Sequence, residues 1–145
     1  VLDHLSDCAA LVMVAAVADY RPLKSAPEKM KKTQGECITL EFERTPDILS
    51  AVAEFRSRQG VPDMVIGFAA ETEDLLKNAR EKLVSKGLDL IAANDITAPD
   101  AGFGADTNRV TLLWKDGRQE ELPRLSKSEV GERVIKAVVS ALDAS

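Results

Sequence analysis

Four lysines and one aspartate give the clearest chemical signal in the sequence. The lysines crowd one short polar segment, although the chain carries a net charge of −5: Lys24, Lys29, Lys31 and Lys32. Asp19 precedes them, close behind an apolar run. A flexible ammonium group can neutralise charge that develops on a transferring phosphate. A carboxylate can hold a ribose hydroxyl or a metal–phosphate complex. This segment therefore indicates a loop that binds phosphorylated, nucleotide-type ligands.

The same residues also have a purely structural interpretation. An aspartate at position 19 can cap the turn before Tyr20-Arg21-Pro22, and composition alone favours the two roles equally. A run of lysines usually forms a solvated surface, so Lys29, taken alone, is better explained as an exposed surface charge than as a binding-site residue. The predicted secondary structure around these side chains is needed to choose between a ligand-binding loop and a purely structural role.

The rest of the chain alternates between strand and helix patterns. Three apolar runs, residues 9–16, 64–70 and 88–93, are typical of strands buried on both faces of a parallel sheet. Helix start signals stand between them at Thr45-Pro46-Asp47 and Thr72-Glu73-Asp74. This alternation predicts an α/β fold with right-handed crossovers.

Weaker patterns complete the expected fold. Residues 37–42 alternate like a strand, and residues 109–115 and 119–122 flank an Asp116-Gly117 turn as a hairpin. A capping box at residues 126–129 opens the last helix. We expect a single, partial domain over residues 1–145, with a mainly parallel sheet and a C-terminal β-hairpin.

Two glycine-rich phosphate-binding patterns are missing. The chain contains neither GxGxxG nor GxxxxGK[ST], and it begins in VLDHLSD, which resembles the tail of a helix. A minimal fold would explain this. We favour the alternative that the domain is truncated at its N-terminus, with a first βαβ unit upstream of residue 1, because three parallel strands leave little room to cover both sheet faces.

Composition excludes several classes of protein. Only one histidine, His4, and two cysteines without a CxxC spacing are present, so a zinc site is close to excluded. Cys8 and Cys37 fit small core residues. The negative net charge argues against a general nucleic-acid binder. The longest apolar run, residues 8–18, is about half of a membrane span. A cytoplasmic location fits best.

In an open parallel sheet, ligands bind beyond the carboxyl ends of the strands. The segments that leave the predicted strands there are residues 17–20, 68–71 and 94–95. Small residues at the first two ends would let a ligand approach the backbone. Phe68 has core packing as its default role, and Trp114 is expected to be structural. Periodicity and spacing lead only to an α/β domain with a basic loop above its sheet.

Six strings resemble successive blocks of one known family. In chain order they are AAVADYRP, APEKMKK, ERTPDIL, GFAAET, AREKLVSKGLDLIAAND and GFGADTNRVTLL. The family is the bacterial phosphopantothenate–cysteine ligase domain. It is usually fused behind a flavin-dependent phosphopantothenoylcysteine decarboxylase in one coenzyme A biosynthesis protein. The similarity covers essentially the whole chain.

The resemblance implies an activity and its reactants. The family joins 4′-phosphopantothenate to L-cysteine, using CTP in bacteria. CTP activates the carboxylate as an acyl-cytidylate with release of pyrophosphate, and the cysteine amine then displaces CMP. The resemblance also implies Mg²⁺ with the triphosphate, a homodimer, and a Rossmann-like three-layer α/β/α fold. FMN would belong only to the fused decarboxylase domain. Neither nucleic acid nor a membrane is implied as a partner.

The resemblance also implies site residues. Asp19 and Lys29 match nucleotide-contacting positions and are the candidate catalytic residues, since Lys29 matches the family's candidate for stabilising the transferring group. The other positions that match nucleotide contacts are Met13, Val14, Ala15, Pro46, Asp47, Ile48, Leu49, Phe68, Lys82 and Lys86. Lys82 and Lys86 conflict with the expected topology, because the carboxyl end of their helix faces away from the strand ends. No metal ligand is predicted.

The chain also departs from the family. The glycine-rich strand–turn block and the ITNRSSGKMG-type block with which the family begins do not occur. We therefore expect this polypeptide alone to release no pyrophosphate above background from CTP, phosphopantothenate and cysteine. Two alternatives stay open. One is a non-catalytic nucleotide-binding or dimerisation fragment. The other is a generic Rossmann-like oxidoreductase module, which would need the missing glycine fingerprint.

Overall fold

The computed structural model describes residues 1–26, 28, 37, 39–71, 74–96 and 106–144. These residues form two compact units, residues 1–14 with 48–145 and residues 15–47, which are described separately. The larger unit contains η1 (Leu2–Asp7), β1 (Ala10–Met13), α1 (Ile48–Gln59), β4 (Met64–Glu71), α2 (Leu75–Ser85), β5 (Leu90–Asp95), β6 (Thr107–Asn108), β7 (Val110–Trp114), β8 (Gln119–Glu121), β9 (Leu125–Ser126) and α3 (Lys127–Leu142). The smaller unit contains β2 (Tyr20–Pro22) and β3 (Phe42–Arg44).

The main sheet has the strand order β1-β4-β5-β7-β8. β1, β4 and β5 are parallel, as the alternation of strands and helices predicts. β7 pairs antiparallel with β5, and β8 with β7, which confirms the predicted hairpin. Gly117 occupies the hairpin turn with a φ of 91°, which suits a residue without a Cβ.

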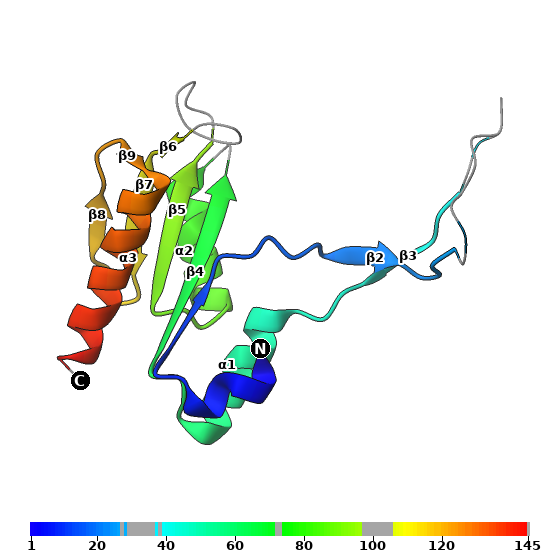
Figure 1. Ribbon diagram of the computed structural model, residues 1–145, viewed down its shortest axis with the longest axis horizontal. Helices are drawn as coiled ribbons and strands as arrows, with labels where there is room; N and C mark the ends of the chain where they lie inside the picture. Colours follow the sequence, from blue (N-terminus) through cyan, green and yellow to red (C-terminus); the bar gives the residue numbers. More distant parts are fainter. Residues whose placement is uncertain (27, 29–36, 38, 72–73, 97–105, 145) are drawn as a thin grey trace. The chain divides into compact units, whose positions relative to one another are not determined.

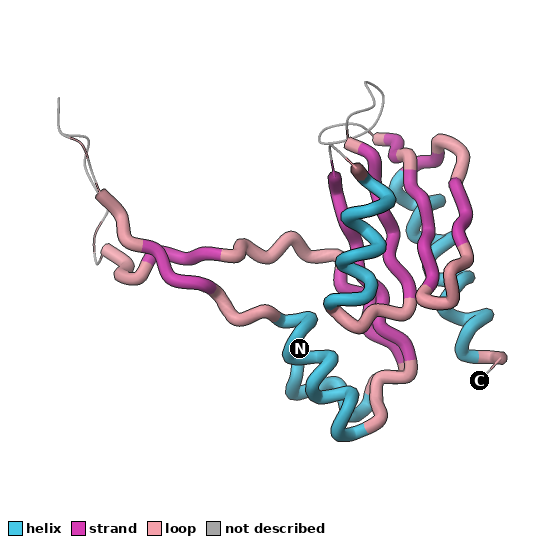
Figure 2. The backbone as a smooth tube through the Cα atoms, turned by 180° about the vertical axis from the view of Figure 1, so that it is seen from behind, coloured by secondary structure: helices cyan, strands magenta, loops and turns pink. Residues whose placement is uncertain are grey.

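Helices cover both faces of this sheet, so the expected three-layer Rossmann-like α/β/α arrangement is confirmed (Figures 1 and 2). On one face α1 and α2 contribute Val52, Ala79 and Leu83 to a core with β4 and β5. On the other face α3 contributes Val130, Val134 and Val138 to a core with β4, β5 and β7. Each set recurs at helical spacing, which is why the sequence identifies these faces.

Capping residues determine where several helices begin or end. The predicted capping box is present, because the Ser126 side chain accepts from the Glu129 backbone N–H and the Glu129 carboxylate accepts from the Ser126 N–H. Gly87 follows α2 with a φ of 62°, as expected for a helix-ending glycine. Thr45 does not cap α1. Its Oγ1 instead donates to the Ala18 carbonyl at 2.6 Å.

Three sequence expectations about burial and strands are wrong. β1 is half-buried rather than buried, because it pairs only with β4 in the described part of the sheet. Cys37 is exposed, and only Cys8 is partly buried. The strand expected at residues 37–42 begins at Phe42, and Leu40 is exposed. The strand forms only where residues 42–44 pair with β2. Alternation along one segment cannot reveal this pairing.

One buried carboxylate lies just before β5, at the amino end of the sheet. The Asp89 side chain is 7% exposed and accepts hydrogen bonds from Arg56 Nη1 at 2.7 Å, from the Val65 N–H at 2.8 Å and from Lys115 Nζ. Burial raises the pKa of Asp89, but the hydrogen bonds from Lys115, Val65 and Arg56 together outweigh it and lower the pKa below 3.8. Asp89 therefore ties α1, β4 and the β7–β8 turn to the start of β5.

Candidate functional site

The carboxyl ends of β1, β4 and β5 meet at one edge of the sheet, because the three strands are parallel. Met13 ends β1, and Val14 follows it with 60% of its surface exposed. Phe68 is partly buried near the end of β4 and packs on the α3 side of the sheet. Of the predicted nucleotide contacts, Met13, Val14 and Phe68 therefore lie toward this edge, with Met13 paired to Gly67 four residues before the end of β4. We call this edge the carboxyl rim.

A second group of predicted residues lies at the start of α1. Ile48 and Leu49 open the helix, and the next residue, Ser50, lies beside Lys86, whose Nζ is 3.5 Å from Ser50 Oγ. Lys82 is one turn earlier on α2 and half-buried. The α2 carboxyl end does face away from the strand ends, as expected. Lys86 nevertheless reaches Ser50, the residue directly after the block at the helix start that the same resemblance assigns to the nucleotide.

The structure keeps these two groups apart. Figure 1 shows α1 beside the amino-end half of the sheet, whereas the arrowheads of β4 and β5 mark the opposite end. The larger unit therefore supplies two separate sets of candidate contacts, one at the carboxyl rim and one at the α1 start with Lys86.

The remaining predicted residues belong to the smaller unit, residues 15–47, with Ala15, Asp19, Pro46 and Asp47 all exposed. The backbone of Asp19 is fixed, because its carbonyl accepts from the Thr45 N–H at 2.9 Å. No hydrogen bond to the Asp19 carboxylate occurs among the described residues, so the turn-capping interpretation gains no support. Lys29, Lys31 and Lys32 lie outside the described residues, and the role of Lys29 stays a prediction.

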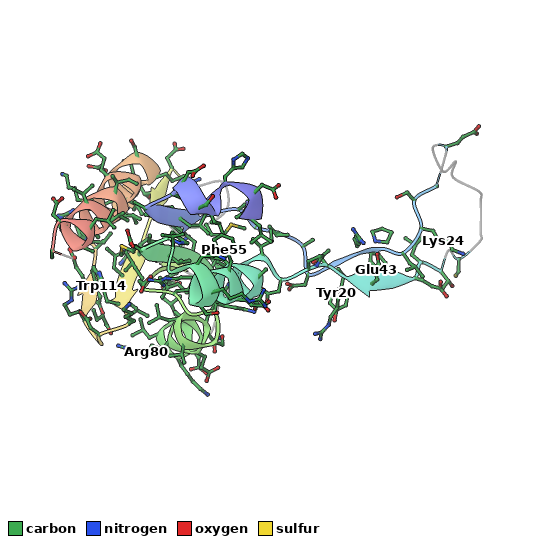
Figure 3. All side chains as sticks on the ribbon, turned by 90° about the horizontal axis from the view of Figure 1, so that it is seen from below. Tyr20, Lys24, Glu43, Phe55, Arg80 and Trp114 are labelled. Carbon is green, nitrogen blue, oxygen red and sulfur yellow. The ribbon has the colours of Figure 1, made fainter. Side chains whose placement is uncertain are left out.

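The smaller unit is a two-stranded antiparallel ribbon with two different faces. Tyr20 is opposite Arg44, and Pro22 is opposite Phe42, so these four share one face. Arg21 lies on the other face and donates to Glu43 at 2.7 Å. Figure 3 shows Tyr20, Glu43 and Lys24 projecting from this ribbon. Its apolar side chains are largely exposed, with Tyr20 at 52% and Phe42 at 54%.

Two asparagines near the carboxyl rim are absent from the predicted site. The Oδ1 atoms of Asn94, near the end of β5, and Asn108, on β6, are buried and have no hydrogen-bond partner among the described residues. Asn94 ends a predicted strand and was visible as a polar residue at a strand end. Nothing in the sequence marks Asn108, because its burial depends on the pairing of β6 with β9.

The described residues show no ready-made metal site. No group of three or more His, Cys, Asp or Glu side chains in the described ranges could hold a metal ion. Within the same ranges, no helix is long and apolar enough to cross a bilayer.

The mixed sheet, with parallel strands β1, β4 and β5 and helices on both faces, defines a Rossmann-like α/β domain. Comparison with known proteins narrows this class. Residues 1–142 match the family model described as the DNA/pantothenate metabolism flavoprotein C-terminal domain. The chain belongs to this family.

Two relatives carry the same name. The coenzyme A biosynthesis bifunctional protein CoaBC of Bacillus subtilis (strain 168) is 46% identical over 130 residues, which cover 90% of this chain and 31% of the relative. CoaBC of Escherichia coli (strain K12) is 42% identical over 131 residues, covering 89% of this chain and 31% of the relative. The chain thus spans about a third of the length of these relatives.

Solved structures agree in fold. The crystal structure of the C-terminal domain of CoaBC matches with a TM-score of 0.74 at 36% identity, covering 99% of this chain and 62% of that chain. A structure of a Cab2 mutant in complex with phosphopantothenate-cysteine matches with a TM-score of 0.58 at 18% identity, covering 89% of this chain and 42% of that chain. At that identity the likeness concerns the fold alone.

Proposed function

We propose that this chain is the nucleotide-binding part of a CTP-dependent phosphopantothenate–cysteine ligase in coenzyme A biosynthesis. The observation that carries the proposal is the family match over residues 1–142, together with 46% identity to CoaBC of Bacillus subtilis. The carboxyl rim supports it, because ligands of parallel α/β sheets bind at this end of the strands.

The proposed reaction has two steps. The phosphopantothenate carboxylate attacks the α-phosphate of CTP, so a carboxylate–phosphate bond forms and pyrophosphate leaves. The cysteine amine then attacks the acyl carbon, CMP leaves, and an amide forms. The chemistry requires negative charge to be neutralised on the transferring phosphate, which is the role proposed for Lys29. Asp19 would contact the nucleotide or its Mg²⁺.

Magnesium would be held mainly by the triphosphate. Mg²⁺ usually keeps several waters and binds through one or two carboxylates plus substrate phosphates, not in an all-protein cage. The exposed Asp19 carboxylate fits this pattern as a single protein ligand. Asp19 is therefore the residue of this chain proposed to face the metal–triphosphate complex.

Calorimetric titration of the chain with CTP, ATP and NADH tests the proposal. Binding of CTP in preference to ATP and NADH is the expected result. NADH binding would indicate an oxidoreductase instead. If none of the three ligands binds, the chain is a non-binding fragment and the proposal fails for this polypeptide.

We also propose that the ribbon of residues 15–47 pairs two copies of the chain. An isolated two-stranded ribbon is marginally stable in water, so exposed apolar side chains on one face indicate that another surface covers them. Tyr20, Leu40 and Phe42 are each more than half exposed. A second copy would supply a matching apolar face by symmetry.

Sedimentation analysis tests the pairing. The wild-type chain should be a dimer and Phe42→Glu a monomer, because the substitution places a charge in the apolar face. Glu43→Gln is the matched control on the opposite face and should leave the dimer intact. A monomeric wild-type chain at micromolar concentration would show that the ribbon does not pair copies.

A further inference from the structure

Two carboxamide side chains near the carboxyl rim have buried oxygens that nothing in the described structure satisfies. Asn94 Oδ1 and Asn108 Oδ1 are inaccessible to solvent and accept no hydrogen bond from the described residues. Most buried polar atoms in folded proteins do have a partner. An acceptor that is buried without one costs folding free energy. A pair of them at a ligand-binding edge therefore needs an explanation.

Register and core contacts place both side chains on the α3 side of the main sheet, although Asn108 belongs to the separate β6–β9 sheet. Asn94 follows Leu90 and Ala92 at alternate positions of β5, and both of those residues lie in the core under α3. Asn108 is opposite Leu125, which packs against the same core. Both asparagines therefore face the α3 side.

Strand pairing and chain connectivity bring the two residues close together. Asn94 is opposite Val110, and the Asp95 N–H donates to the Arg109 carbonyl at 3.0 Å, so the pairing continues past the end of β7. Asn108 directly precedes Arg109 and pairs with Leu125 of β9 in a separate two-stranded sheet, so it lies one residue beyond the last contact between β5 and the β7 segment. Chain connectivity therefore keeps Asn108 near Asn94.

The neighbouring strand supplies an open wall beside the pair. Ala70 on β4 is directly opposite Asn94, and Phe68 precedes Ala70 on the same face. Ala70 is exposed and Phe68 is half-buried, so both remain partly accessible. A ligand that lies over these two residues would meet the asparagines at the end of β5.

We propose that Asn94 and Asn108 form a carboxamide pair that recognises hydroxyl or amide N–H donors of a ligand bound over Phe68 and Ala70. Their oxygens accept these hydrogen bonds when the ligand arrives. The inference rests on the proposed function, whose reactants offer two sources of such donors. One is the ribose and amino group of the nucleotide, and the other is the hydroxyl and amide groups of phosphopantothenate.

Calorimetric titration of the double variant Asn94→Ala/Asn108→Ala, with CTP and with 4′-phosphopantothenate in separate runs, tests the pair. Binding of one ligand should weaken about tenfold or more, and the affected ligand identifies the source of the donors. The melting temperature of the unliganded variant should not fall, because the removed oxygens make no hydrogen bond in the described structure. The single variants Asn94→Ala and Asn108→Ala keep the test available if the double variant does not fold.

Gln119→Ala is the matched control. Its side-chain amide is exposed on β8 and already accepts a hydrogen bond from Arg80 Nη2 at 2.9 Å, so binding should not change.

The outcomes separate the inference from the proposed function. If wild type binds CTP or phosphopantothenate and the asparagine variants bind each ligand with the same affinity as wild type, the pair is not a recognition site. The proposed function then still stands. A lower melting temperature with unchanged affinity would assign a structural role and also overturn the pair. A wild-type chain that binds neither ligand overturns the proposed function, and this inference fails with it.

Discussion

At the amino end of the main sheet, the buried Asp89 carboxylate accepts hydrogen bonds from three groups, whereas near the carboxyl end the buried oxygens of Asn94 and Asn108 accept none in the described structure. Asp89 directly precedes β5 and Asn94 lies near its end, whereas Asn108 is on β6, just before β7 in the chain. The fold therefore satisfies polar groups at one end of a strand and leaves them unsatisfied at the other. If the proposed carboxamide pair binds a ligand, stability and ligand recognition are separated between the two ends of the sheet.

The neighbouring residues follow the same division. Around Asp89, two side chains and one backbone N–H from three segments distant in sequence meet at one carboxylate, which stabilises the packing of these segments. Around the carboxyl rim the residues are small or partly open, such as Ala70 and Val14. Substitutions at the amino end should therefore change the free energy of unfolding, and substitutions at the rim should change binding.

Asp89→Asn should lower the free energy of unfolding by about 3 kcal/mol, because a partly buried Arg56 and the buried Val65 N–H lose a charged acceptor. Urea denaturation measures this change. Asp116→Asn removes an exposed ion pair with Arg118 and is the control, for which no measurable change is expected. Equal stability of Asp89→Asn and wild type would contradict the proposed division between the two ends.

Gly67→Ala should lower the free energy of unfolding by about 2 kcal/mol, since overpacking of a dense core costs roughly 1–3 kcal/mol. A Cβ at position 67, in the middle of β4, would lie 2.6 Å from Leu88 Cδ1, and Leu88 is itself buried. Gly131→Ala on α3 is the control, because its Cβ would meet nothing within 4 Å. That substitution should stabilise the helix. A destabilised Gly131→Ala variant would show that the room available for a Cβ does not by itself determine the change in the free energy of unfolding.

The contribution of Asp89 should depend on pH in one direction. Its pKa is lowered in the folded state, so its ion pairs stabilise the fold above the unfolded-state pKa near 3.8. Their contribution is lost as the pH falls through the lower, folded-state pKa. The stability difference between wild type and Asp89→Asn should therefore be constant from about pH 7 to pH 5 and shrink below pH 4. Urea denaturation at a series of pH values measures it, and a difference that grows on acidification would show the opposite shift.

The sequence predicts the local elements of the fold better than the side-chain contacts at either end of the sheet. The apolar stripes of the helices, the β7–β8 hairpin and the Ser126 capping box are local patterns, and each is confirmed. The position of Asp89 in a predicted buried strand gives no hint of its partners, because Arg56 and Lys115 are 33 and 26 residues away. Asn108 escapes detection for the same reason. Contacts that depend on register across distant segments need the fold itself.

Lys86→Met should weaken CTP binding about tenfold. A charge-assisted hydrogen bond to a phosphate is worth about 1.5–3 kcal/mol, which corresponds to a tenfold or greater change in affinity. Lys77→Met, on the exposed surface of the same helix, is the matched control and should bind CTP like wild type.

Lys86 is on the α1 side and not at the carboxyl rim, so a loss of affinity would assign the α1 start to the binding surface. Unchanged affinity in both variants would confine the binding site of the larger unit to the carboxyl rim and remove Lys86 from it.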